Sequence, residues 1–127
     1  MNNIELGKKI IRTEIAGIEQ LYETLGESFN AAIEKILTIK GKVIITGVGK
    51  PGHIATKIAA TLASTGTPAF FIHATEASHG DLGMIDKNDL VIMISFSGAS
   101  KELGDIINYC KRFNVFLVGI TSIPDSP

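Results

Sequence analysis

Three short segments of the chain gather residue types that bind anions or move protons. The first covers residues 47–52, Gly-Val-Gly-Lys-Pro-Gly, where glycines let backbone N–H groups approach an anion and Lys50 adds an ammonium group. The second covers residues 95–100, Ser-Phe-Ser-Gly-Ala-Ser, and its three hydroxyls suit an uncharged cradle for phosphate. Glu102 follows closely and can serve as a carboxylate base. Together these segments predict an anion site that can also transfer protons.

The third segment, residues 73–83, contains two histidines, one glutamate and one aspartate within nine positions. Such a set can bind a metal, but the compact ligand spacing of a zinc site is missing. We therefore expect acid–base or hydrogen-bonding roles here and no metal.

The glycine-rich segment 47–52 has competing interpretations. It satisfies G-x-G-x-x-G, the dinucleotide-binding pattern, but that pattern expects an acidic residue about 20 positions later, where His73 stands. It is not a P-loop, because Lys50 precedes Gly52 instead of following the last glycine. Two interpretations of the segment remain. Either the glycine turn directs backbone N–H groups and the Lys50 ammonium at an anion bound at a helix N-terminus, or it is a plain turn with a solvated lysine. The serines of residues 95–100 can likewise be ordinary helix caps.

The elements around these segments predict an α/β fold with a parallel sheet. Apolar, β-branched runs at residues 42–46, 69–73, 90–95 and 116–121 alternate with helical patterns, of which those at 53–63 and 101–113 can be placed. Continuous apolar strands of this kind are covered by helices on both faces. Because ligands of open parallel sheets bind at the carboxyl ends of the strands, we expect function in the loops that begin at residues 47, 73, 95 and 121.

The first forty residues are predicted to be helical. Apolar residues recur at steps of three or four from Ile11 to Ile36, and Gly26 marks a break between two helices. The apolar stripe fits either core packing or a helical arm that pairs with another subunit. We therefore predict an arm at residues 1–40 and a ligand-binding domain at residues 41–127. The ending at residues 123–127 is abrupt for a sheet of four strands, so this domain is expected to be incomplete at its C-terminus.

Composition narrows the class of protein. The 127 residues are 45% hydrophobic and carry a formal net charge of −1, which favours one packed domain and gives no global field for nucleic acid or an anionic membrane. No apolar run approaches the roughly 18 residues of a membrane span. The single Cys110 cannot form an internal disulfide, and the start lacks the pattern of a signal peptide. A cytoplasmic protein is expected.

Read together, the motifs at residues 47–53, 79–83 and 95–98 resemble those of the D-arabinose-5-phosphate isomerase family, in the same order and spacing across residues 41–122. The resemblance implies a sugar-isomerase (SIS) domain, a flavodoxin-like three-layer sandwich with a five-stranded parallel sheet, here preceded by N-terminal helices. It also implies interconversion of D-ribulose 5-phosphate and D-arabinose 5-phosphate on the way to Kdo of lipopolysaccharide. No cofactor is expected, the partner is a phosphosugar, and the protein is expected to be a homo-oligomer.

The resemblance also assigns roles to individual residues. It implies catalytic roles for Lys50, His79 and Glu102, with Glu102 as the base, His79 as an acid–base group and Lys50 as the partner of substrate oxygens. The phosphate-binding positions that it implies are Gly49, Ser95, Ser97, Gly98 and Ser100.

Several residues depart from the family pattern. Pro51 stands where a serine is usual, which removes a hydroxyl and a backbone donor, and Phe96 and Ala99 also replace usual residues. The chain is also shorter than family members, which continue into further catalytic residues. The alternative prediction is therefore a phosphosugar-binding or sensing module without turnover.

Overall fold

The computed structural model describes residues 2–78, 80–96 and 101–121. The chain divides into two compact units, residues 1–34 and residues 35–127. Each unit is described on its own below. Among the described residues, no helix combines the length and the apolar character that a membrane span requires.

The first unit consists of helices. Helix α1 spans Asn3–Thr24 and begins with a capping box, in which the Glu5 backbone N–H donates to the Asn2 side chain at 2.8 Å and the Asn2 N–H donates back to the Glu5 carboxylate at 3.2 Å. Leu25 is extended and ends the helix. Helix α2, Glu27–Thr38, begins after Gly26 and continues into the second unit. The predicted break between two N-terminal helices is confirmed.

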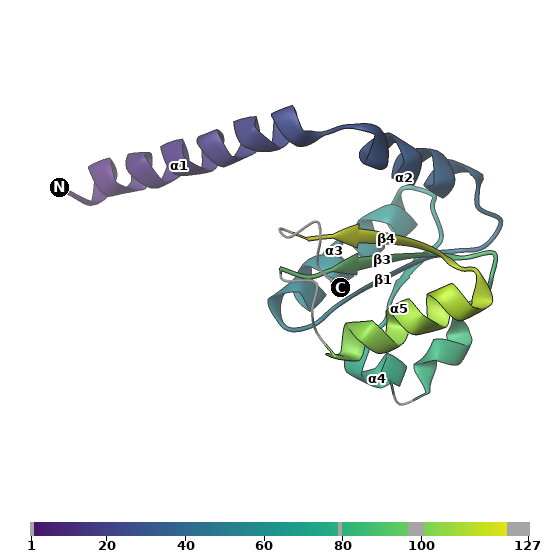
Figure 1. The fold of residues 1–127 in the computed structure, drawn as a ribbon. Helices are drawn as coiled ribbons and strands as arrows, with labels where there is room; N and C mark the ends of the chain where they lie inside the picture. The colour runs from purple at the N-terminus through teal and green to yellow at the C-terminus, as the bar shows by residue number, and fades with distance from the viewer. Residues whose placement is uncertain (1, 79, 97–100, 122–127) are drawn as a thin grey trace. The chain divides into compact units, whose positions relative to one another are not determined.

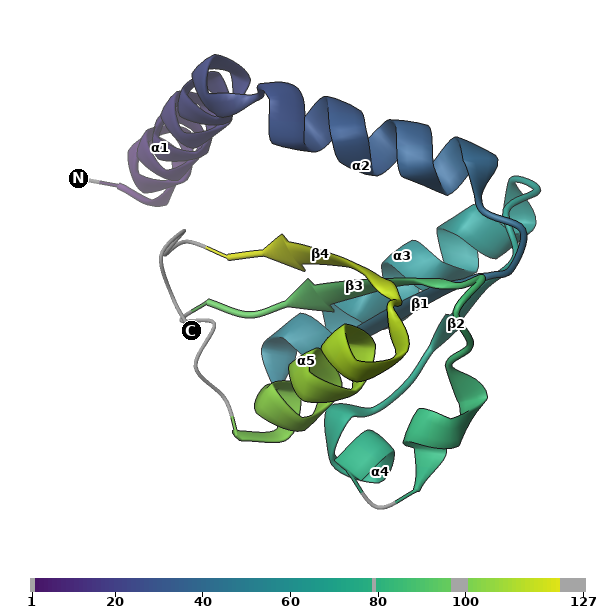
Figure 2. The same ribbon diagram turned by 45° about the vertical axis from the view of Figure 1, so that its right-hand side comes forward.

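The second unit contains a four-stranded parallel sheet with the order β2-β1-β3-β4 (Figures 1 and 2). The strands are β1 (Val43–Gly47), β2 (Ala69–Phe71), β3 (Leu90–Ile94) and β4 (Phe116–Ile120). Between them lie helices α3 (Lys50–Ser64), α4 (Ala74–Ser78) and α5 (Lys101–Phe113), and the 3-10 helix η1 (Asp81–Met84). The predicted α/β class with a parallel sheet is confirmed.

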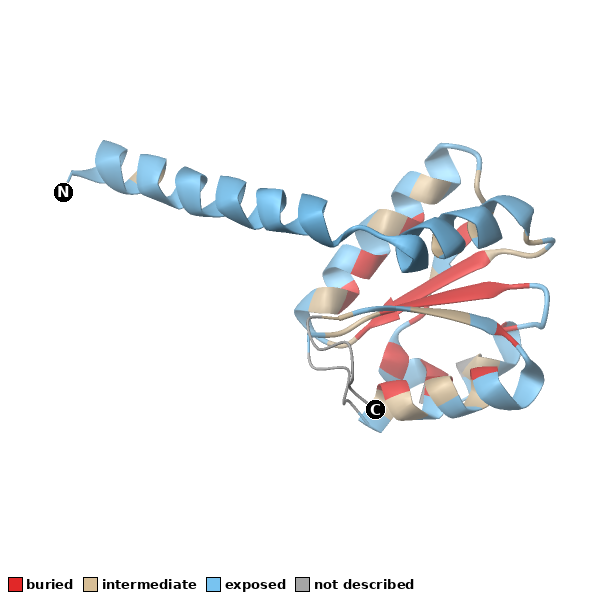
Figure 3. Ribbon diagram, turned by 45° about the horizontal axis from the view of Figure 1, so that its top comes forward, coloured by how far each residue is buried: buried red, intermediate tan, exposed pale blue. Residues whose placement is uncertain are grey.

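The two central strands, β1 and β3, are buried on both faces of the sheet, which gives the predicted three layers. Ile44 of β1 packs in a cluster with residues of α4 and α5, whereas Val43 and Ile45 pack in a second cluster with residues of α3. This division follows from the alternation of side chains along a strand. Figure 3 shows β1 and β3 buried along their lengths, as expected for central strands of a parallel sheet.

Two helical details differ from the sequence prediction. Helix α3 begins at Lys50, three residues before the predicted start, because Pro51 is compatible with the first turn of a helix. The segment at residues 73–83, predicted as a loop, contains α4 and η1. Ala74 and Ala77 of α4 are fully buried, and the Thr75 backbone N–H donates to His73 Nδ1 at 3.2 Å near the start of this helix. A helix of five residues is too short to show a periodic pattern.

A carboxylate clamp ties together the chain at the amino ends of the central strands. Asp89, which is 3% exposed, accepts hydrogen bonds from the Lys42 backbone N–H and Nζ, both at 2.8 Å, and from the Asp86 backbone N–H at 2.9 Å. Burial raises the pKa of Asp89, but the bonds from Lys42 and Asp86 outweigh it and hold the pKa below the ordinary value. The clamp therefore favours an ionised Asp89.

Cys110 lies on the buried side of α5. Burial raises the pKa of its thiol to about 11. The thiol is therefore protonated at neutral pH.

Candidate functional site

The candidate site lies at the carboxyl ends of β1 and β3, which are adjacent strands with Gly47 opposite Ile94. The chain order reverses between these strands, since β2 lies on the other side of β1. Ligands of doubly wound sheets bind at such a switch point. The two motifs that the sequence singled out follow β1 and β3, so the fold brings them to the same edge of the sheet.

The turn after β1 depends on two glycines. Gly49 has a φ of 71°, in the left-handed region that glycine adopts readily. A Cβ atom on Gly47 would lie 2.8 Å from the backbone carbon of Pro51 and 3.0 Å from the Gly52 nitrogen. The strand thus passes against the first turn of α3 at a distance that only glycine permits.

The N-terminus of α3 carries a cation and no side-chain cap. Gly49 is the N-cap residue and makes no side-chain hydrogen bond to the helix. Lys50, the first helical residue, is exposed. Pro51 lacks an N–H group, so one of the first amides of this helix is missing. The remaining partial positive charge of the helix terminus and the Lys50 ammonium both favour an anion.

The loop after β3 is tied to the end of β4. The Ser95 backbone N–H donates to the Ile120 carbonyl at 3.0 Å, and the Thr121 hydroxyl donates to the Phe96 carbonyl at 3.1 Å. These bonds fix the position at which the chain leaves the sheet and enters the serine-rich segment.

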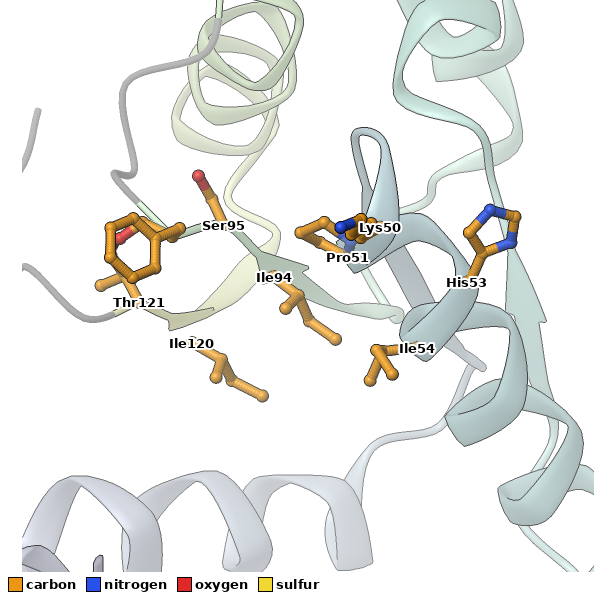
Figure 4. A pocket seen from close by; sticks show the side chains of 9 residues that line it. Lys50, Pro51, His53, Ile54, Ile94, Ser95, Ile120 and Thr121 are labelled. Atoms are coloured by element: carbon orange, nitrogen blue, oxygen red, sulfur yellow. Dashed lines mark hydrogen bonds between the residues drawn. The ribbon is translucent and has the colours of Figure 1, made fainter. Parts of the chain in front are cut away.

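A hollow of about 530 Å³ opens between the start of α3 and the ends of β3 and β4 (Figure 4). Its lining consists mostly of apolar side chains with a polar rim, from Lys50, Pro51, His53, Ile54, Ile94, Ser95, Phe96, Ile120 and Thr121. Lys50 of the first motif and Ser95 of the second therefore border the same space.

The two faces of the sheet differ in chemistry at this edge. In Figure 4 the side chains of Ile54, Ile94 and Ile120 point to one side, and the Ser95 hydroxyl points to the other. Glu102 lies in the first turn of α5, the helix that packs on the face opposite α3. The apolar hollow is thus on the α3 side, whereas the Ser95 hydroxyl and the helix that carries Glu102 are on the α5 side.

Thr46 adds a buried hydroxyl to the α5 side. Its position in β1, two residues after Ile44, places it on the α5 face, and it is 1% exposed. Its Oγ1 has no hydrogen-bond partner within the described part of the chain. Buried hydroxyls are nearly always paired, so this one marks a polar position beneath the site. The sequence did not reveal it, because threonine is an ordinary strand residue.

The structure describes four of the predicted site residues. Gly49 and Lys50 lie at the N-terminus of α3, Ser95 follows β3, and Glu102 begins α5. The other predicted residues, His79, Ser97, Gly98 and Ser100, lie outside the described residues. No group of three or more potential metal ligands occurs within residues 2–78, 80–96 and 101–121.

The apolar wall of the hollow, formed by Ile54, Ile94 and Ile120, was not expected from the sequence. These isoleucines fit helix and strand patterns that usually belong to a core. Ile54 and Ile120 are 54% and 50% exposed, so only the fold reveals that they line an open space.

Comparison with known proteins identifies relatives across nearly the whole chain. Arabinose 5-phosphate isomerase KdsD of Yersinia pestis is 49% identical over 122 residues, which is 96% of this chain and 37% of that protein. Arabinose 5-phosphate isomerase GutQ of Escherichia coli K12 is 48% identical over 124 residues, which is 98% of this chain and 39% of that protein. The chain thus spans less than two fifths of the length of these relatives.

A solved structure of an E. coli CFT073 protein in complex with arabinose 5-phosphate is similar, with 42% identity and a TM-score of 0.87. The similarity covers 99% of this chain and 69% of that one. The model of the SIS domain family matches residues 36–127, which include every strand of the sheet and both motifs of the site. This chain therefore belongs to the SIS domain family.

Proposed function

We propose that this chain supplies the phosphosugar site of a cytoplasmic aldose–ketose isomerase that interconverts D-ribulose 5-phosphate and D-arabinose 5-phosphate on the route to Kdo of lipopolysaccharide. The observation that carries the proposal is that the β1–β3 switch point brings the uncapped N-terminus of α3, with Lys50, and the Ser95 position after β3 to the same edge of the sheet. The identity of 48–49% to arabinose 5-phosphate isomerases supports this choice of substrate.

The phosphate is proposed to bind where α3 and the loop after β3 converge. The uncapped N-terminus of α3 at Gly49 and the Lys50 ammonium supply positive charge there. The Ser95 hydroxyl supplies a neutral donor, and Ser97, Gly98 and Ser100 are proposed to complete the cradle.

The chemistry is proposed to proceed through an enediol. Glu102 removes a proton from C1 of the ketose and returns it to C2, while His79 carries a proton from the C1 hydroxyl to the C2 oxygen. Lys50 stabilises the negative charge that develops on the substrate oxygens. No electrons leave the substrate in these steps, so no redox cofactor is needed. A positioned base contributes roughly 10²- to 10⁴-fold to such a rate.

The test separates binding from turnover. The chain is incubated with D-ribulose 5-phosphate, product formation is followed by phosphorus NMR, and D-arabinose 5-phosphate binding is measured by calorimetry. Glu102→Gln is compared with Asp105→Asn on the same helix, and Lys50→Ala with Lys57→Ala on α3. We expect Glu102→Gln to lose turnover and keep binding, Lys50→Ala to weaken both, and the two control variants to behave as wild type.

The other outcomes are equally decisive. Turnover that survives Glu102→Gln would remove Glu102 from the role of base. Binding without turnover in the wild-type chain would replace the isomerase with a phosphosugar-binding module. If D-arabinose 5-phosphate does not bind and no product forms from D-ribulose 5-phosphate, the proposed function is wrong for this chain.

A further inference from the structure

Helix α1 exposes an apolar stripe along its length. None of its described residues is buried, and Figure 3 shows the helix exposed nearly throughout. The stripe follows steps of seven, four, three and four residues through Ile4, Ile11, Ile15, Ile18 and Tyr22, which are between 42% and 77% exposed. Residues at this spacing share one face of a helix.

Such a helix needs a partner. Most of the stability of a helix in a protein comes from packing of its apolar face, and none of the 22 residues of α1 is buried. The capping box at Asn2 and Glu5 contributes only about 1 kcal/mol. The stripe is therefore an interaction surface, and the charges beside it indicate what binds there.

The charges of α1 are divided between its two halves. Residues 3–13 contain Lys8, Lys9 and Arg12 against a single Glu5, whereas residues 14–24 contain three glutamates and neither lysine nor arginine. If a second copy of the helix lies antiparallel to the first, the basic half of each copy lies against the acidic half of the other. A parallel copy brings like charges together, which is unfavourable.

The positions of these charges agree with that orientation. Lys8, Arg12, Glu19 and Glu23 follow steps of four, seven and four residues, so they lie on one flank of the stripe. Two antiparallel helices that share their apolar stripes bring the same flanks together. Lys8 of one copy then lies beside Glu23 of the other, and Arg12 beside Glu19, and the two-fold axis repeats both pairs.

We propose that two copies of this chain associate through antiparallel pairing of their α1 helices. The apolar stripes form the contact, and the divided charges set its orientation. The proposal is independent of the function proposed for the sheet domain, because every residue that it uses lies in the first unit.

The first test uses reversed charges in the full chain. Wild type is expected to sediment at twice the 13.5 kDa of one chain or a higher even multiple. Two double variants are made. Lys8→Glu with Arg12→Glu leaves only acidic residues at the four charged positions of the flank, and Glu19→Lys with Glu23→Lys leaves only basic ones. Each double variant alone is expected to show half the wild-type mass, and an equimolar mixture is expected to regain the wild-type mass. Circular dichroism checks that helix content is retained, and Gln20→Glu on the opposite face is the matched control.

The second test reads the orientation directly. A Lys8→Cys chain mixed with a Glu23→Cys chain is expected to form a disulfide between copies, and Lys8→Cys alone is not, because fifteen residues of helix separate the two sites by about 22 Å. The buried thiol of Cys110 does not compete. A monomeric wild type, double variants that associate as wild type does, or rapid cross-linking of Lys8→Cys alone would each overturn the proposal.

Discussion

Replacing Gly47 with alanine tests whether the close approach of β1 to α3 builds the candidate site. The added Cβ would lie 2.8 Å from the backbone carbon of Pro51 and 3.0 Å from both the Pro51 oxygen and the Gly52 nitrogen. All three atoms belong to backbone, so no flexible side chain can move aside. Since ordinary contacts begin at 3.4 Å, the first turn of α3 must shift by about 0.6 Å.

Two opposing effects set the size of the change at Gly47. Alanine restricts the unfolded chain, which stabilises the fold by about 0.4–1 kcal/mol. Overpacking against rigid backbone destabilises it by about 1–3 kcal/mol. The second effect is larger, so we expect Gly47→Ala to lower the free energy of unfolding by about 1–2 kcal/mol. It should also weaken sugar-phosphate binding, because the helix terminus that carries Lys50 moves.

The assay is urea unfolding followed by linear extrapolation, with sugar-phosphate binding measured on the same samples. Gly104→Ala in α5 is the matched control, because no heavy atom lies within 4 Å of the Cβ position there. That variant should gain about 0.5–1 kcal/mol from helix propensity. If Gly47→Ala unfolds at the same urea concentration as wild type and binds as well, the reasoning about the close approach is refuted.

Two further predictions concern groups away from the site. Asp89→Asn should lower the free energy of unfolding by about 3 kcal/mol at pH 7, because it removes the charge that pairs with Lys42. The pKa of Asp89 is lowered in the folded state, so its contribution is complete above the ordinary value of 3.8 and is lost as the pH falls below it. The difference in the free energy of unfolding between wild type and variant should therefore become smaller below about pH 4. A difference that stays constant with pH would show that ionised Asp89 does not stabilise the fold through its bonds to Lys42 and Asp86. Cys110, with its pKa raised to about 11, should react with iodoacetamide at pH 8 only after the chain is unfolded in urea, and rapid labelling of the native chain would show that the thiol is accessible.

The elements that could be predicted from the sequence are those with long or continuous apolar patterns. The four strands lie within two residues of the predicted ranges, since each lies in a mainly apolar run, and the runs of β1 and β3 are buried as central strands of a parallel sheet are. Helix α5 has the predicted bounds because its stripe of Leu103, Ile106 and Cys110 is regular and fully buried. Helix α4 could not be predicted, because two buried alanines within five residues carry too little pattern to identify a helix.

The candidate site was only partly predictable for a different reason. Lys50 and Ser95 could be selected because their glycine-rich and serine-rich motifs each follow a strand and together resemble the pattern of a known family. Thr46 and the isoleucines of the hollow could not, because their residue types are normal for strands and helices. Their position at the edge of the sheet depends on the register of β1 and β3, which only the folded chain defines.

The missing side-chain cap at Gly49 has a consequence for any attempt to stabilise this protein. Placing serine or aspartate at a helix N-cap usually adds about 1 kcal/mol and is a standard engineering change. Here the new side chain would have to adopt a φ of 71°, and its oxygen would occupy the amides that an incoming anion requires. Selection for thermal resistance and selection for ligand affinity should therefore favour different residues at this one position.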